Sequence, residues 1–103
     1  MSEAKNRTMN RRTRMYYFYI LRCSDNTLYS GQTNNLEERV KIHNTDNSKS
    51  AKYTKYRRPV KLIYFEEYQT LQEAMKREHQ VKKWTKIKKE ALVNNDLELL
   101  RKL

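Results

Sequence analysis

A glutamate within a predicted helix is the residue that most strongly suggests chemistry in this sequence. The hydroxyl of Thr70 and the carboxylate of Glu73 fit a capping box, so a helix is predicted to begin near residue 71 and to run to about Trp84. A helical stripe through its apolar positions passes over Glu78. Those apolar positions are Leu71, Ala74, Met75 and Val81. Because a buried carboxylate is costly unless a cation, a metal or hydrogen-bond donors meet it, Glu78 either holds a metal ion or pairs with a lysine or arginine at the core edge.

A second predicted helix carries an arginine and a histidine on one face. Asn34 and Asn35 can cap a helix through residues 36–44, and Arg39 and His43 lie four residues apart along it. Arg39 could neutralise a phosphate through its planar fork of donors, while His43 orients or accepts a proton. The plainer interpretation is a solvated helix face with a structural histidine.

Two predicted strands, residues 16–22 and 28–33, place tyrosines where a third element of a site could come from. The turn formers SDNT lie between them, so the two strands are predicted to form a β-hairpin. If Tyr19 pairs with Gly31, the only glycine of the chain, Tyr19 and Tyr29 share a face and the missing side chain makes room for a ring. A slip of one residue would send the tyrosines to opposite faces. A tyrosine that acts as a base would need nearby positive charge, which Arg39, His43 and a basic loop could supply. The plainer interpretation is that these tyrosines are ordinary core residues of strands.

The charge of the chain points to a polyanionic partner. The formal net charge is +11, which makes nucleic acid the first candidate and a ribosome or membrane surface the alternative. Residues 44–59 are predicted to form a polar loop in which basic and aromatic side chains alternate, as in a nucleic-acid contact, although a solvated loop is common in so basic a chain. The predicted contacts are Lys52, Tyr53, Lys55, Arg57 and Arg58 in this loop, with Lys82 and Lys83 on the later helix.

The remaining sequence favours a single intracellular domain. Residues 1–14 are predicted to be a basic flexible arm, and residues 60–68 are predicted to form a third strand. The segment after Trp84 is predicted to form one or two short helices, with a break at Asn94 and Asn95 and a second capping box from Asn95 to Glu98. No segment approaches the roughly 20 apolar residues of a membrane helix. Cys23 is the only cysteine, so a reducing compartment is the simpler interpretation.

Together these segments resemble the GIY-YIG nuclease domain. The stretches YFYILRC, LYSGQTNNLEERVKIHN, AKYTKYRRPVKLIY and EAMKREHQVKKWTKIKKEAL look like the small single-domain GIY-YIG proteins of bacteria and some large DNA viruses, over about residues 15–93. The first motif reads Tyr17-Phe18-Tyr19, without its glycine, and the second reads Tyr29-Ser30-Gly31. The asparagine that many larger members carry late in the chain has no secure match.

The resemblance implies an α+β fold, a small three-stranded antiparallel sheet flanked by helices. It divides the chain into the arm (1–14), the nuclease domain (15–93) and a C-terminal helical extension (94–103). It implies that Glu78 holds one Mg²⁺ or Mn²⁺, Arg39 offsets phosphoryl charge, and Tyr19 or Tyr29 activates or positions the attacking water, with His43 tuning it.

The implied activity is metal-dependent endonuclease cleavage of DNA, with branched, nicked or single-stranded DNA as candidate substrates, low sequence specificity and a role in repair or recombination. A non-catalytic nucleic-acid-binding module of the same fold is the main alternative, and a protein-interaction or ribosome-associated domain is a third. No membrane or obligate protein partner is expected. The expected location is the cytoplasm, or the nucleus if the source is a virus of a eukaryotic host.

Overall fold

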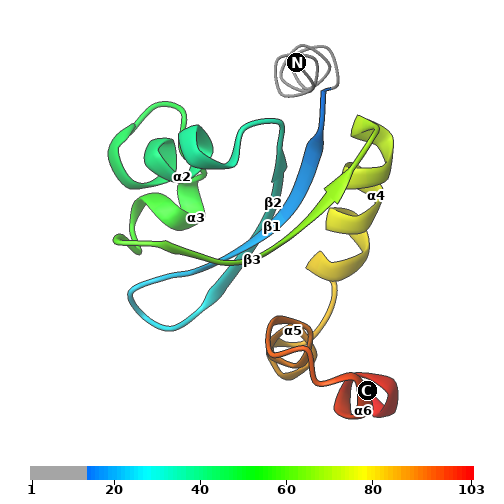
Figure 1. The fold of residues 1–103 in the computed structure, drawn as a ribbon. Coiled ribbons are helices and arrows are strands. Elements are labelled where there is room, and N and C mark those ends of the chain that lie inside the picture. The colour runs from blue at the N-terminus through cyan, green and yellow to red at the C-terminus, as the bar shows by residue number, and fades with distance from the viewer. Residues whose placement is uncertain (1–13) are drawn as a thin grey trace, which may run out of the picture.

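A three-stranded antiparallel sheet organises the molecule. The computed structural model describes residues 14–103, so the predicted arm lies outside the described residues except for Arg14. The strands are β1 (Tyr16–Arg22), β2 (Leu28–Thr33) and β3 (Lys61–Tyr68), in the order β2-β1-β3 (Figure 1). The first two strands have the predicted bounds, and the third begins one residue later than predicted.

The hairpin between β1 and β2 is closed by its own polar residues. The Asp25 carboxylate accepts hydrogen bonds from the backbone N–H and the hydroxyl of Thr27, at 3.1 and 2.6 Å. Asn26 takes a left-handed conformation (φ 70°), which asparagine tolerates better than most residues. This turn fixes the register in which Tyr19 lies opposite Gly31 and Leu21 opposite Tyr29.

Helices cover both faces of the sheet, so the fold is α+β, as predicted. Figure 1 shows α2 and α3 on one side and α4 with α5 on the other, followed by α6. The bounds are α2 (Leu36–Thr45), α3 (Lys52–Lys55), α4 (Leu71–Lys82), α5 (Lys86–Val93) and α6 (Leu97–Lys102).

The two sides of the sheet form two core clusters because side chains along β1 alternate. Phe18 and Ile20 pack toward Val81 and Leu92 on the α4 and α5 side. Tyr19 and Leu21 belong to the cluster on the α2 side. Among residues 14–103, no helix has the length and apolar character that crossing a membrane would require.

Local capping explains where the helices begin. Asn35 is the N-cap of α2, and its side chain accepts from the backbone N–H of Glu38 at 3.1 Å. The capping box of Thr70 and Glu73 is present at the start of α4. The second predicted box, from Asn95 to Glu98, is wrong. Asp96 caps α6 instead, because Asn95 adopts a left-handed conformation (φ 56°) that passes the capping position to the next residue.

Two other expectations need correction. The predicted loop 44–59 contains the short helix α3, whose Thr54 is fully buried. On α4, Ala74 and Val81 are buried as predicted, but Leu71 and Met75 keep 38% and 48% of their surface exposed. The apolar pattern thus predicted that the helix exists. Which of its side chains face the sheet is determined by the packing of Ala74 and Val81.

Candidate active site

Tyr19 and Gly31 fit together across the hairpin as the sequence predicted. The Tyr19 side chain lies over Gly31 so closely that a Cβ atom there would be 2.5 Å from its hydroxyl oxygen and 2.6 Å from Cζ. A real Cβ contact cannot be that short, so a side chain at position 31 would displace the phenol. Glycine therefore makes the space in which the Tyr19 hydroxyl lies.

A buried hydrogen-bond chain begins at this hydroxyl. Tyr19 Oη is 2.8 Å from His43 Nε2, and His43 Nδ1 is 2.7 Å from Thr54 Oγ1. All three residues are almost completely buried. Burial lowers the pKa of His43 to about 4, with the charges of Arg39 and Arg58 acting in the same direction. At neutral pH His43 is therefore uncharged, so the positive charge near the tyrosines must come from the arginines.

Arg39 supplies positive charge at the tyrosines. It lies one helical turn before His43 on α2, and its guanidinium also donates to the carbonyl of Lys49 at 3.0 Å. Burial raises the pKa of Tyr19 to about 12, and the Arg39 guanidinium beside the phenol opposes that rise. Arg39 likewise opposes the increase that burial and the Glu78 charge cause in the pKa of Tyr29.

Tyr29 is the more accessible of the two motif tyrosines and begins a column of planar groups. Its ring meets the His43 ring edge-on at 5.2 Å and stacks on the Tyr53 ring at 6.0 Å. The Arg57 guanidinium lies over the Tyr53 ring, 3.8 Å from its centroid. Arg57 is held there by bonds to the Tyr53 carbonyl (2.9 Å) and the Asp25 carboxylate (3.1 Å).

Glu78 approaches the site from the other side of the sheet. Its side chain is 22% exposed, between the buried Ala74 and Val81 on α4, and its carboxylate lies 3.7 Å from Lys82 Nζ. The core-edge pairing considered from the sequence is thus present. The charge of Glu78 nevertheless reaches Tyr19 and Tyr29, since it adds to the upward shift in the pKa of each phenol.

Two separate shallow depressions lie at Arg39 and at Glu78. One, of about 530 Å³, is bordered by Arg39, the end of β2 and Leu71. The other, of about 420 Å³, is bordered by Met75, Glu78 and Lys82. Leu71, Met75 and Glu78 follow one another at helical spacing. Leu71, which borders the first depression, and Glu78, which borders the second, therefore lie along one side of α4.

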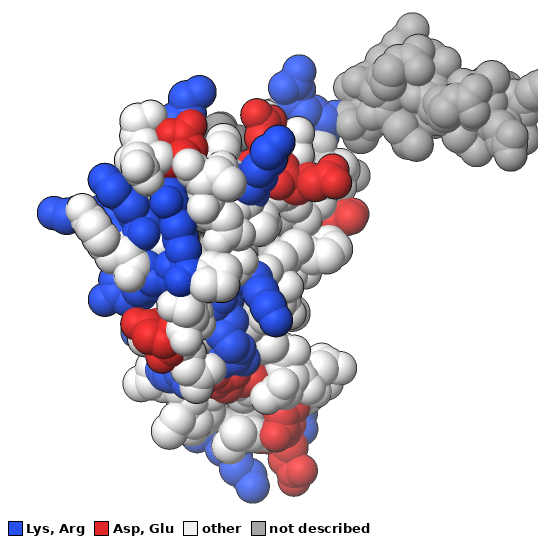
Figure 2. All heavy atoms as spheres, turned by 90° about the vertical axis from the view of Figure 1, so that its left-hand side faces the viewer, with Lys and Arg blue, Asp and Glu red and all other residues white. Residues whose placement is uncertain are grey.

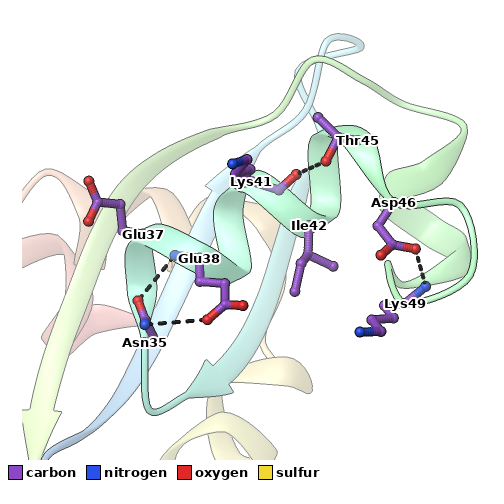
Figure 3. Close-up of a pocket in the computed structure, with 8 residues that line it drawn as sticks. All are labelled: Asn35, Glu37, Glu38, Lys41, Ile42, Thr45, Asp46 and Lys49. Carbon is purple, nitrogen blue, oxygen red and sulfur yellow. Dashed lines mark hydrogen bonds between the residues drawn. The ribbon is translucent and has the colours of Figure 1, made fainter.

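A further depression, of about 570 Å³, lies elsewhere. Figure 3 shows its lining along the outer side of α2 and the following loop. Several of these side chains serve the local fold, since Asn35 caps α2 and Asp46 binds the backbone of Lys49. Its lining has three carboxylates and two lysines, so it does not offer the surplus of positive charge that phosphate binding favours. None of the five predicted catalytic residues lines it.

Basic side chains gather on the side of the molecule formed by α2 and α3. Figure 2 views this side and shows Lys and Arg over much of its upper and middle part. Lys52 is exposed at the start of α3, and Lys55 is half-buried at its end. Lys82 and Lys83, both exposed, lie at the end of α4, away from this cluster.

The Arg58 side chain makes several hydrogen bonds to other residues of the protein. Its guanidinium donates to the His43 carbonyl at 2.7 Å, to Asn47 Oδ1 at 3.0 Å and to Ser50 Oγ at 3.2 Å. These bonds tie the loop after α2 to the helix. The predicted nucleic-acid contact at Arg58 therefore coincides with a structural role.

Thr54 is the residue of this site that the sequence interpretation missed. It lies eleven residues after His43 in a stretch that reads as polar loop, and no local pattern marks it as buried. The contact exists because Asn44 holds the loop in place, through side-chain bonds to the backbone N–H and carbonyl of Val60 at 2.8 and 3.0 Å. The spacing of Tyr53 and Arg57, one helical turn apart, was a signal that could have revealed their contact.

The comparisons with known proteins identify the family of the chain. A family model described as the GIY-YIG catalytic domain matches residues 15–91, and the chain therefore belongs to that family, as the motifs suggested. Its similar relatives are UPF0213 proteins, small bacterial GIY-YIG proteins. One from Clostridium perfringens is 51% identical over 81 residues, covering 79% of this chain and 85% of that protein. YazA of Bacillus subtilis is 49% identical over 81 residues, covering 79% and 80%.

Solved structures resemble the same region. The solution structure of a UPF0213 protein from Bacillus halodurans has a TM-score of 0.50 at 39% identity and covers 78% of this chain and 83% of that one. A solution structure of an E. faecalis protein has a TM-score of 0.54 at 36% identity, covering 79% and 84%. The family points to nuclease chemistry on a nucleic acid.

Proposed function

We propose that this protein is a metal-dependent endonuclease that hydrolyses phosphodiester bonds in DNA. The proposal rests on one observation: Arg39, His43 and the two motif tyrosines lie together in the fold. The charge of the Glu78 carboxylate acts on both of these tyrosines. A module that only binds nucleic acid has no need for that combination. Branched, nicked and single-stranded DNA are the substrates to test first.

Tyr29 is the residue that we assign to the attacking water. A base must touch the water that it activates, and Tyr29 is half-buried whereas Tyr19 is 1% exposed with its hydroxyl bonded to His43. Arg39 favours the phenolate form of Tyr29 and offsets charge that develops on the phosphoryl oxygens. Tyr19 and His43 hold the edge of the site against which Tyr29 packs.

Glu78 is the residue that we assign to one Mg²⁺ or Mn²⁺. Within residues 14–103 no group of three or more His, Cys, Asp or Glu side chains could hold a metal, so a site here must rely on few protein ligands. Mg²⁺ fits such a site because it keeps several waters and binds through one or two carboxylates plus substrate phosphate oxygens. When bound, the ion would polarise the scissile phosphate and stabilise the leaving oxygen. Glu78 suits this role because it is partly exposed and its pairing with Lys82 is loose.

The contacts to DNA are assigned to basic and aromatic groups on both sides of the site. The column of Tyr29, Tyr53 and Arg57 presents planar groups beside the catalytic residues. Lys52 and Lys55 on α3 can neutralise phosphates, and Lys82 and Lys83 can do so near Glu78. Such contacts read the backbone and not the base sequence.

A cleavage assay with a matched pair of variants tests the proposal. Plasmid, branched, nicked and single-stranded substrates are incubated with Mg²⁺, Mn²⁺ or EDTA. Glu78→Gln is expected to lower the cleavage rate at least about 100-fold while folding and DNA binding persist, because it removes the charged metal ligand but little packing. Glu67→Gln, at an exposed carboxylate on β3, serves as the control and should cleave like wild type.

Two outcomes would contradict parts of the proposal. Cleavage by Glu78→Gln at the wild-type rate would show the metal assignment to be wrong. DNA binding by the wild type without turnover in any metal would favour the non-catalytic module instead.

A further inference from the structure

Thr54 lies at the end of the buried hydrogen-bond chain that starts at Tyr19. Its hydroxyl oxygen is 2.7 Å from His43 Nδ1 and 3.0 Å from the carbonyl oxygen of Ala51. Thr54 and His43 are both completely buried, so no water competes for these positions. The hydrogen that each member of this hydrogen-bond chain donates can therefore be deduced.

The Ala51 carbonyl can only accept a hydrogen bond. Thr54 has one hydroxyl hydrogen, which the geometry directs at this carbonyl beside the backbone N–H of Lys55, also at 3.0 Å. The Thr54 oxygen must then accept from His43 Nδ1, so the ring carries its hydrogen on Nδ1. A neutral imidazole has one N–H, which leaves Nε2 with a free lone pair. Tyr19 must consequently donate its own hydrogen to His43 Nε2.

We propose that Thr54 is a positioning residue, which fixes His43 in the tautomer with hydrogen on Nδ1 and thereby makes Tyr19 a donor to His43. The functional consequence rests on the nuclease activity proposed above. With its hydrogen directed at His43, the Tyr19 oxygen keeps its lone pairs for donors such as the Arg39 guanidinium. In the other tautomer, Nε2–H would occupy a lone pair of Tyr19, and the phenolic hydrogen would need another acceptor, which the Arg39 guanidinium, a donor only, cannot provide.

The threonine can be changed in two ways that separate its hydroxyl from its shape. Thr54→Val keeps the volume and removes both hydrogen bonds, whereas Thr54→Ser keeps the hydroxyl and removes a methyl group. The chain has two histidines, so a His79→Gln background, changing the exposed histidine on α4, leaves His43 as the single imidazole to observe.

Nitrogen-15 NMR of the His43 ring at neutral pH is the direct test. We expect the wild type and Thr54→Ser to show a protonated Nδ1 and an unprotonated Nε2, and Thr54→Val to lose this pattern. A wild-type ring protonated at Nε2 would overturn the proposal even if the valine variant fails to fold. An unchanged ring pattern in folded Thr54→Val would overturn it as well.

Cleavage kinetics provide the second readout. Thr54→Val is expected to lower kcat by about tenfold or more, because a histidine in the wrong tautomer misorients the groups that depend on it. Thr54→Ser should stay within about twofold of wild type. Equal kcat values for the valine and serine variants would overturn the functional part. The NMR result does not depend on cleavage, so failure of the nuclease proposal and failure of the Thr54 proposal are distinguishable.

Discussion

At the scale of single residues, Gly31 shows how one missing side chain determines the site. Gly31→Ala would place a Cβ atom 2.5 Å from the Tyr19 hydroxyl oxygen, and the buried ring has little room to move away. We expect a loss of about 1–3 kcal/mol in the free energy of unfolding, as for other overpacked cores, measured by urea denaturation. The bond from Tyr19 to His43 should also be disturbed.

The neighbouring Ser30→Ala is the control for that measurement. Ser30 is buried, and its hydroxyl is the buried side-chain polar atom that finds no hydrogen-bond partner within residues 14–103. Removing an unpaired hydroxyl should change stability little or raise it slightly. If Gly31→Ala were as stable as Ser30→Ala, the contact with Tyr19 would not be the constraint described.

His43 predicts a dependence of stability on pH. Its pKa is about 4 in the folded protein and about 6.5 when unfolded, so the unfolded chain binds more protons between these values. Stability is then fully present above about pH 6.5 and falls as the pH drops toward 4. Between pH 7 and pH 5 we expect a loss of about 2 kcal/mol, measured by urea denaturation at each pH.

A His43→Gln variant provides the comparison, because glutamine does not titrate. Its stability should change much less between pH 7 and pH 5 than that of the wild type. An equal decline in both proteins would assign the pH dependence to other groups. The carboxylates whose pKa the fold lowers lose their contributions mainly at more acidic pH; they are Asp25, Asp46, Glu66 and Glu90.

At the scale of elements, one ion pair connects the sheet to the C-terminal helices. The Arg22 guanidinium on β1 makes two bonds to the Glu90 carboxylate on α5, at 2.8 and 2.9 Å, and Lys86 lies 3.1 Å from the same carboxylate. Arg22 chiefly holds the pKa of Glu90 down to about 2. The paired form is thus stabilised above the ordinary pKa of glutamate, and this contribution is lost as the pH falls toward 2.

Glu90→Gln should lower the free energy of unfolding by about 1 kcal/mol at pH 7, since the pair is partly exposed and solvent weakens it. Urea denaturation at pH 7 and at pH 2.5 measures the effect, and the difference from wild type should shrink at the lower pH. The control is Glu98→Gln, an exposed position on α6. A Glu90 variant no less stable than the Glu98 variant would contradict the role of the pair.

The elements that local sequence specifies could be predicted, and those that depend on distant packing could not. Aromatic and β-branched residues on either side of a polar turn predicted β1 and β2 to the residue, and Thr70 with Glu73 predicted the start of α4. In contrast, α3 forms within a loop that Asn44 and Arg58 hold against α2, which are contacts that no local pattern reveals.

The same distinction holds within the candidate site. The pairing of Tyr19 with Gly31 follows from strand alternation and one register, so the sequence could suggest it. The position of Thr54 beside His43, and the neutral state of that histidine, follow from burial in the assembled fold. Sequence reasoning therefore named the catalytic candidates but not the residue that orients one of them.

At the scale of the whole molecule, the positive charge predicts how DNA binding responds to salt. The formal net charge is +11, and each phosphate contact releases counterions, so the logarithm of the binding constant should fall linearly with the logarithm of the salt concentration. The variant Lys52→Gln/Lys55→Gln should weaken binding and reduce that slope by about 1–2, measured by fluorescence anisotropy of labelled DNA.

A second double variant separates local contacts from total charge. Arg101→Gln/Lys102→Gln also removes two positive charges, but on α6, beyond α5 and away from α3 (Figure 1). Its salt slope should stay close to that of the wild type. Equal slopes for the two double variants would mean that net charge governs binding and that α3 makes no specific contact.

The fit of Tyr19 against Gly31 also bears on how the chain selects its fold. A slip of one residue would turn the β1 side chains to the wrong face, and a slip of two would set the Tyr19 ring against Tyr29 or Thr33, both of which carry side chains. Since the sequence contains no other glycine, the hairpin offers this ring one place to lie flat. The same residue that opens the site thus discriminates against misaligned hairpins while the protein folds.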